Sequence, residues 1–205
     1  RYTEALQQIG VEALYHPWMP EPMRWLRENG AQFDAVILSR HYVAAPLLQA
    51  VRHYAPQAKL VFDTVDLHYL REEREAALAD RDDLRRQAAS TKMAELRLIR
   101  QSDVTLVVSP IEQELLQREV PGARIEVLSN VHEVVGRSTG FDERKDLFFV
   151  GGFQHPPNVD AMLWFVHAIW PLVAKALPDV RFHIVGSRMP EAIAALASER
   201  VIVHG

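Results

Sequence analysis

Short runs of apolar and β-branched residues recur along the chain, and turn-forming residues bound each of them. They lie at Val11–Tyr15, Ala35–Leu38, Leu60–Phe62, Val104–Val108, Ile125–Leu128, Leu147–Val150, Val180–Val185 and Val201–Val203. Such runs are typical of strands that are buried on both faces of a parallel sheet. The pattern predicts five strands before residue 136 and three after residue 146.

Segments with helical periodicity separate these runs. They lie at Pro22–Asn29, Val43–Tyr54, Tyr69–Gln101, Ile111–Glu119, Asn158–Leu177 and Pro190–Ala197. Ser109 followed by Pro110 favours a helix start, because serine is a good N-cap and proline suits the first helical turn. The alternation of strands and helices predicts an α/β chain of βαβ units with doubly wound, Rossmann-like parallel sheets.

The clearest domain boundary is the stretch 136–146, GRSTGFDERKD, which combines glycines and charges with few apolar residues. We expect an N-terminal domain over 1–135, a linker over 136–146 and a second domain over 147–205. Three strands make only part of a sheet, so the second domain is expected to be incomplete. Its edge near Val201–Val203 is then exposed and open to self-association. The chain opens on Arg1 rather than Met, and we expect the first strands of the N-terminal domain to precede it.

The overall composition excludes several classes of protein. The 205 residues are 48% hydrophobic and 24% charged, which is typical of globular domains and unlike disordered, collagenous or coiled-coil chains. The net charge of −4 gives no electrostatic case for nucleic-acid binding. The absence of cysteine excludes disulfides, thiolate zinc sites and cysteine catalysis, and it fits a reducing compartment. No apolar run is expected to reach the ~20 residues of a membrane span.

Polar residues gather after the strand Leu60–Phe62, where parallel sheets bind their ligands. Asp66, His68 and Arg71 follow it within nine residues. A carboxylate or a neutral imidazole there can accept hydrogen bonds from sugar hydroxyls or act as a base. The same residues also fit a helix-capping Asp66 and a surface His68.

Two later strand ends carry glycine. Gly151 and Gly152 follow Leu147–Val150, and Gly186 precedes Arg188 after Val180–Val185. Glycines at a strand end let backbone N–H groups approach a phosphate, and a following helix N-terminus adds its dipole. The full G-x-G-x-x-G pattern and the P-loop lysine are absent, so tight turns explain these glycines equally well.

The segment Tyr69–Gln101 carries eight basic and seven acidic residues between Arg71 and Arg100. Mixed charges at short spacing favour a solvated helix, although Arg71, Arg74 and Arg81 could meet an anionic acceptor or a lipid head group. The nine histidines form neither H-x-x-x-H nor H-E-x-x-H, so no metal site is expected. The G-x-S-x-G elbow of serine hydrolases is also absent.

Three stretches together resemble the group 1, retaining, nucleotide-sugar-dependent glycosyltransferases of the two-Rossmann-domain (GT-B) architecture. The first runs from Glu95 through Ser102–Ser109 to Glu112 and matches the family's passage "E…aD.v..vS..e". The second is Ile125–Asn130, similar to the run "v.viPNg". The third runs from Leu147–Phe153 to Gly205 and resembles the opening half of the nucleotide-binding domain.

The resemblance implies transfer of a sugar, with retention of configuration, from a nucleotide-diphosphate sugar to a cell-surface glycan or a lipid-linked acceptor, as in bacterial polysaccharide biosynthesis. We expect no cofactor, and the lack of cysteine fits a cytoplasmic protein, for which a lipid-linked acceptor would suit the inner face of a membrane. Together with the strand-end and charge patterns above, the resemblance leads us to expect Asp66 and His68 in catalysis, Gly151, Gly152, Asn158, Gly186 and Arg188 at the donor, and Arg71 and Arg74 at the acceptor.

Two departures from the family pattern keep other functions open. The loop after Leu147–Val150 lacks the Arg and Lys that grip the donor diphosphate in many relatives. The family's acidic pair belongs downstream of Gly205, so we expect a truncated chain that is inactive alone. The alternatives are a nucleotide-sugar epimerase of the same architecture and a non-catalytic fragment that binds a sugar or a nucleotide.

Overall fold

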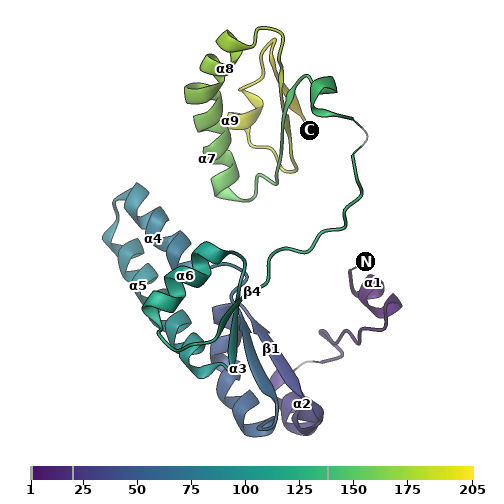
Figure 1. Ribbon diagram of the computed structural model, residues 1–205, viewed down its shortest axis with the longest axis vertical. Helices are drawn as coiled ribbons and strands as arrows, with labels where there is room; N and C mark the ends of the chain where they lie inside the picture. The colour runs from purple at the N-terminus through teal and green to yellow at the C-terminus, as the bar shows by residue number, and fades with distance from the viewer. Residues whose placement is uncertain (1, 20, 138) are drawn as a thin grey trace. The chain divides into compact units, whose positions relative to one another are not determined.

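The computed structural model describes residues 2–19, 21–137 and 139–205. They form two compact units, Arg1–His132 (unit 1) and Glu133–Gly205 (unit 2), which are drawn in Figure 1 and described separately below. Each unit contains one sheet of parallel strands covered by helices, which confirms the predicted α/β class. Of the predicted linker 136–146, Ser138 lies outside the described residues.

Unit 1 contains a four-stranded parallel sheet in the order β1-β2-β3-β4. The strands are β1 (Ala35–Ser39), β2 (Lys59–Asp63), β3 (Val104–Val107) and β4 (Ile125–Val127). The helices that connect them are α3 (His41–Tyr54), then α4 (His68–Ala79) with α5 (Asp82–Gln101), and α6 (Pro110–Glu119). All four strands coincide with predicted apolar runs to within a residue.

Only one face of this sheet is covered by helices. Crossovers between parallel strands are right-handed, so a strand order that advances in one direction places every connecting helix on the same face. Leu38, Leu60 and Phe62 point to that face and are buried, whereas the side chain of Ile37 is 61% exposed. The expectation of a doubly wound sheet whose strands are buried on both faces is therefore wrong for the described part of unit 1.

The N-terminal region differs most from the sequence expectation. It holds α1 (Tyr2–Gln8), which the pattern did not predict, and α2 (Pro22–Asn29), which it predicted residue for residue. A short 3₁₀ turn, η1 (Gly30–Gln32), leads into β1. Val11–Tyr15 forms no strand, because no described strand pairs with it, and Val11 and Tyr15 are exposed.

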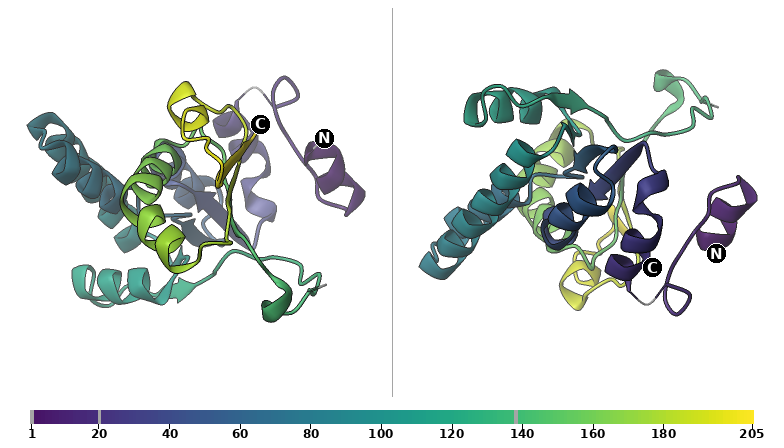
Figure 2. Two further views of the ribbon diagram at one scale, coloured as in Figure 1. Left: turned by 90° about the horizontal axis from the view of Figure 1, so that it is seen from above. Right: turned by 90° about the horizontal axis from the view of Figure 1, so that it is seen from below.

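The predicted single helix over Tyr69–Gln101 is a helical hairpin. Asp80 ends α4 in the left-handed conformation (φ 50°), and α5 folds back along α4, as the labels of Figure 1 show and the two further views of Figure 2 agree. Folding back buries Ala76 of α4 and Ala88 of α5. One straight helix over the same 33 residues would reach about 50 Å and leave those faces in solvent.

Two polar motifs fix the remaining elements of unit 1. Ser109 Oγ accepts a hydrogen bond from Glu112 N at 3.3 Å, and Pro110 opens α6, which confirms the predicted helix start. Asp103, directly before β3, accepts hydrogen bonds from Leu60 N at 2.7 Å and from Arg52 Nη1 at 2.9 Å. This carboxylate therefore ties β3 to β2 and to α3.

Unit 2 contains a three-stranded parallel sheet in the order β5-β6-β7, with β5 (Leu147–Val150), β6 (Phe182–Val185) and β7 (Val201–His204). Its helical segments are the 3₁₀ turn η2 (Phe141–Glu143), α7 (Pro156–Trp164), the π-helical turn η3 (Phe165–Ile169), α8 (Trp170–Ala176) and α9 (Glu191–Ala194). Phe148 and Val150 are about two-thirds exposed, so this sheet also has an open face. Among the described strands β7 pairs only with β6, and it forms the predicted sheet edge.

The segment Pro156–Ala176 is long and apolar enough to cross a membrane by length and composition alone, with 21 residues and a mean hydropathy of 1.3. This corrects the expectation that no apolar run approaches that length. Within the same segment, Met162 and Trp170 are buried in the core of unit 2, and the Trp170 ring lies 5.8 Å from that of Phe182. Only 11% of its most apolar window is buried, so the segment packs on this core by one narrow face.

Candidate functional site

The carboxyl ends of β1 and β2 meet at one edge of the unit 1 sheet. Ser39 Oγ, at the end of β1, donates a hydrogen bond to Asp63 Oδ2 at 3.0 Å, at the end of β2. The other carboxylate oxygen of Asp63 accepts from Val65 N at 3.1 Å. This carboxylate thus holds the turn that carries Asp66 and His68.

Residues with positive φ follow three of the parallel strands. Arg40 (φ 70°) follows β1, Val65 (φ 63°) follows β2, and Arg188 (φ 55°) follows β6 in unit 2. Such conformations cost of order 1–3 kcal/mol each outside glycine and concentrate at functional sites. Val65 is the most unusual, because β-branched residues rarely adopt positive φ. The strain therefore lies at the strand ends where ligands bind in open parallel sheets.

Glu95 of α5 accepts hydrogen bonds from free backbone N–H groups at the N-terminus of α4. Its two carboxylate oxygens accept hydrogen bonds from His68 N at 3.2 Å and Tyr69 N at 3.0 Å, and the side chain is fully buried. Asp66 does not cap this helix; it pairs with Arg71. The alternative in which Asp66 is a cap and His68 a surface residue is therefore wrong.

His68 is buried beside Asp66. The residue is only 5% exposed, and its Nδ1 lies 3.1 Å from Asp66 O and 3.2 Å from Asp66 Oδ1. Both distances suit a bond donated by Nδ1–H, which leaves Nε2 as the acceptor of the ring. The structure thus brings together Asp66, His68 and Arg71, whereas Arg74 lies exposed about one turn further along α4.

His41 is a member of this cluster that the sequence analysis missed. Its ring centroid lies 4.8 Å from that of His68, and its Nδ1 lies 3.6 Å from Glu95 Oε1. Burial, followed by the nearby His68, lowers the pKa of His41. Burial raises the pKa of Glu95, although the two backbone N–H bonds oppose the shift. His41 is the second residue after β1, and strand ends were the positions to search.

In unit 2, the glycines after β5 and β6 allow two loops to touch. A Cβ on Gly186 would lie 2.1 Å from Gly151 O, and a Cβ on Gly151 would lie 2.8 Å from Phe149 Cζ. Gly151 N also donates to Val185 O at 3.1 Å. These two glycines are explained by loop packing, whereas the nearest atom to a Cβ on Gly152 would be Ser187 Oγ at 3.7 Å. Of the neighbouring Gly151 and Gly152, Gly152 is the exposed residue.

The N-terminus of α7 offers a dipole but few donors. Pro156 and Pro157 occupy its first positions and have no N–H. Asn158 N donates to His155 O at 3.0 Å, and its side-chain Nδ2 donates to Gly152 O at 2.9 Å. Asn158 therefore fixes the loop, and an anion at this helix would depend on Gly152 N–H and on a side chain such as the exposed Arg188.

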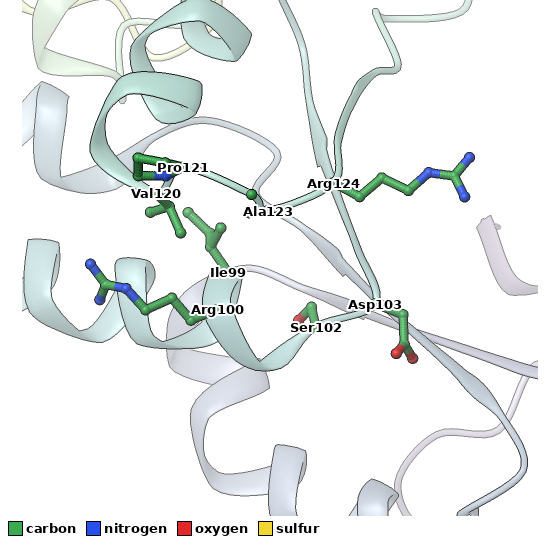
Figure 3. Close-up of a pocket in the computed structure, with 9 residues that line it drawn as sticks. Ile99, Arg100, Ser102, Asp103, Val120, Pro121, Ala123 and Arg124 are labelled. Atoms are coloured by element: carbon green, nitrogen blue, oxygen red, sulfur yellow. The ribbon is translucent and has the colours of Figure 1, made fainter.

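A cavity of about 360 Å³ lies elsewhere in unit 1 (Figure 3). Asp103 and Arg124, which line it, directly precede β3 and β4, so it opens at the amino ends of the strands. The guanidinium groups of Arg100 and Arg124 extend in opposite directions in this view. Ligands of open parallel sheets bind at the other edge, so this cavity is not the candidate site.

The comparison that bears most on function concerns unit 2. Residues 144–205 match the family model described as "Glycosyl transferases group 1". The matched segment contains all of the unit 2 sheet and every predicted donor-binding residue, from Gly151 to Arg188. No curated protein sequence matches this chain.

Solved structures show the same fold over nearly the whole chain. The crystal structure of TarM superposes with a TM-score of 0.62 at 12% identity, over 89% of this chain and 35% of TarM. Sucrose-phosphate synthase from Thermosynechococcus elongatus gives a TM-score of 0.59 at 14% identity, over 95% of this chain and 52% of that enzyme. The chain thus spans between a third and about half of each. At these identities the likeness shows the fold, a Rossmann-like arrangement of two parallel sheets.

Proposed function

We propose that this chain is part of a glycosyltransferase that moves a sugar from a nucleotide-diphosphate donor to a glycan or lipid-linked acceptor, with retention of configuration. The observation that carries the proposal is the group 1 glycosyl transferase match over residues 144–205. The loops of that segment, at the carboxyl ends of β5 and β6, hold the glycines and the arginine expected of a donor site.

The donor diphosphate is assigned to the loops that follow β5 and β6. Gly152 contributes an exposed backbone, and Arg188 an exposed guanidinium. Since Pro156 and Pro157 lack N–H groups, α7 contributes its positive dipole rather than amide donors. A cation and a dipole aimed at the leaving phosphate stabilise the charge that develops as the glycosidic bond breaks.

The acceptor is assigned to the carboxyl edge of the unit 1 sheet. His68 is oriented by Asp66, so its Nε2 can accept a hydrogen bond from a sugar hydroxyl. Asp66 is itself paired with Arg71, which limits the movement of its carboxylate. Arg71 and the exposed Arg74 offer cations to an anionic acceptor.

Nucleotide binding tests the donor half of the proposal. Titrating the chain with nucleoside diphosphates should show binding that Arg188→Met weakens by about 10–100-fold, the equivalent of one charged hydrogen bond. Arg181→Met is the matched control, because Arg181 is an exposed arginine that directly precedes β6. If both variants bind the nucleotide with the same affinity, Arg188 is not part of the donor site.

Turnover of a labelled donor tests the reaction itself. In the full-length protein, Asp66→Ala and His68→Ala should each lower kcat more than they weaken donor binding. Wild-type turnover in both variants would refute the catalytic assignment. Conversion of the labelled donor without any acceptor would instead identify an epimerase.

A further inference from the structure

Two buried side chains and one partly buried side chain, from separate elements, converge behind the strand ends of unit 1. They are His41 at the start of α3, His68 at the start of α4 and Glu95 in α5. One ligand atom from each lies within 4.8 Å of the other two. The side chains are 17%, 6% and 0% exposed, respectively. Their sequence spacing matches no metal motif, because three different elements supply them.

Two distances within this cluster exceed hydrogen-bonding range and are close to the spacing of ligand atoms around one ion. His41 Nδ1 and His68 Nδ1 each lie 3.6 Å from Glu95 Oε1, beyond hydrogen-bonding range. Nitrogen and oxygen ligands bind zinc at 2.0–2.2 Å in tetrahedral geometry, which places neighbouring ligand atoms about 3.3–3.5 Å apart. An approach of the two histidines, whose ligand atoms lie within 4.8 Å of each other, would complete that geometry.

His41 supplies an independent indication of a missing partner. Its Nδ1 is buried and has no hydrogen-bond partner among the described residues, which is uncommon for a buried ring nitrogen. The adjacent Glu95 carboxylate is fully buried, and a cation would balance its charge.

We propose that His41, His68 and Glu95 form a binding site for a divalent transition-metal ion, with zinc as the best-fitting ion. Two imidazole nitrogens and one carboxylate oxygen are a common zinc ligand set. When the ion takes Nδ1 of His68 in place of the bond to Asp66, the ring proton moves from Nδ1 to Nε2, so Nε2 of the metal-bound form donates a hydrogen bond to a sugar oxygen instead of accepting one. The ion would join α3, α4 and α5 where they begin or pass behind the strand ends. It would therefore hold in place the turn that carries Asp66.

Zinc binding by the metal-free chain tests this proposal without any donor or acceptor. Competition with a chromophoric chelator should show one tight zinc per chain. His41→Gln should weaken that zinc by at least about 100-fold, since even the loss of a residue behind a ligand costs 10–100-fold. Glu95→Gln should do the same, but it also alters the cap of α4. His41→Gln is therefore the deciding variant, with circular dichroism confirming its fold.

The second histidine cluster of the chain provides the control. His183 Nδ1 lies 3.0 Å from His204 Nε2, and His183 Nε2 lies 3.2 Å from Asp146 Oδ2, all in unit 2. His183→Gln should leave the tight zinc in place. Zinc affinity that is equal in the wild type and His41→Gln, or a tight zinc lost in His183→Gln instead, would overturn the proposal.

Discussion

Tyr69 joins the three helices that support the strand ends of unit 1. Its side chain is fully buried, and its hydroxyl donates to Glu119 Oε2 of α6 at 3.0 Å. The other oxygen of Glu119 accepts from Lys92 of α5 at 2.6 Å, and the Lys92 ammonium lies 4.8 Å from the centre of the Tyr69 ring. Tyr69→Phe removes one hydrogen bond from this network and leaves the ring in place.

The expected cost follows from these contacts. A hydrogen bond to a charged group contributes about 1.5–3 kcal/mol to stability. Glu119 keeps its bond to Lys92, and phenylalanine leaves no cavity, so the lower half of that range applies. We expect Tyr69→Phe to lower the free energy of unfolding of unit 1 by about 1.5–2 kcal/mol at neutral pH.

The same residue should make stability depend on alkaline pH. Burial, followed by the hydrogen bond to Glu119, raises the pKa of Tyr69 well above its ordinary value of 10.0. Above pH 10 the unfolded chain releases this proton while the folded chain retains it. Wild-type stability should therefore fall by about 1.4 kcal/mol per pH unit there through Tyr69 alone. Tyr69→Phe lacks this contribution, so the two stability curves should converge as the pH rises.

Urea unfolding that is followed by hydrogen exchange of the backbone amides in β2 and β3 measures the stability of unit 1 alone. Tyr2→Phe is the control, because Tyr2 is 88% exposed and its substitution should change nothing. The reasoning about Tyr69 fails if Tyr69→Phe unfolds at the wild-type urea concentration at neutral pH. It also fails if the two curves stay parallel above pH 10.

Three further substitutions test how loops and strands are held. Gly186→Ala should destabilise unit 2 by about 3 kcal/mol or more in thermal unfolding, since its Cβ would lie 2.1 Å from Gly151 O. Gly152→Ala, whose Cβ would make only an ordinary van der Waals contact with Ser187 Oγ at 3.7 Å, should stay within about 0.5 kcal/mol of wild type. Asp103→Ala should cost about 1–2 kcal/mol at neutral pH, because the partly exposed carboxylate binds Arg52 and Leu60 N. Arg52 lowers the pKa of Asp103, so this contribution should disappear as the pH falls below 3.8, which acid unfolding of both forms would show.

The strands could be predicted because each buried strand appears in the sequence as a short run of apolar residues. All seven observed strands lie within or beside predicted runs, and the caps at Ser109 and Pro110 were predicted from local chemistry alone. The failure at Val11–Tyr15 has a physical reason. A β-branched run becomes a strand only when another strand pairs with it, and none of the described strands does.

Tertiary packing decided what periodicity could not. The charged stretch from Tyr69 has continuous helical spacing, and only the packing of Ala76 against the returning helix explains the break at Asp80. The prediction that the strands are buried on both faces was also wrong, because short apolar runs do not indicate whether one or two layers of helices cover a sheet. Strand order decides that number.

The candidate site shows the same division between local and long-range information. Asp66 and His68 were found by searching strand ends, and the same search applied after β1 would have found His41. Glu95 was recognised only as part of a family motif. Its contact with the backbone of His68 and Tyr69 joins residues more than 25 positions apart, which sequence spacing cannot reveal.

The α4–α5 hairpin places its tip, the turn at Asp80, far from the candidate site. We expect the chain to tolerate insertions at this tip. At 1.5 Å per residue, the turn at Asp80 lies about 18 Å along α4 from His68. Glu95 holds the base of the hairpin from the α5 side, so a change in tip length is not transmitted to the strand ends. A short flexible peptide or a fluorescent label inserted between Asp80 and Arg81 should therefore leave the site intact. The hairpin thus offers an attachment point for monitoring ligand binding to unit 1 in solution.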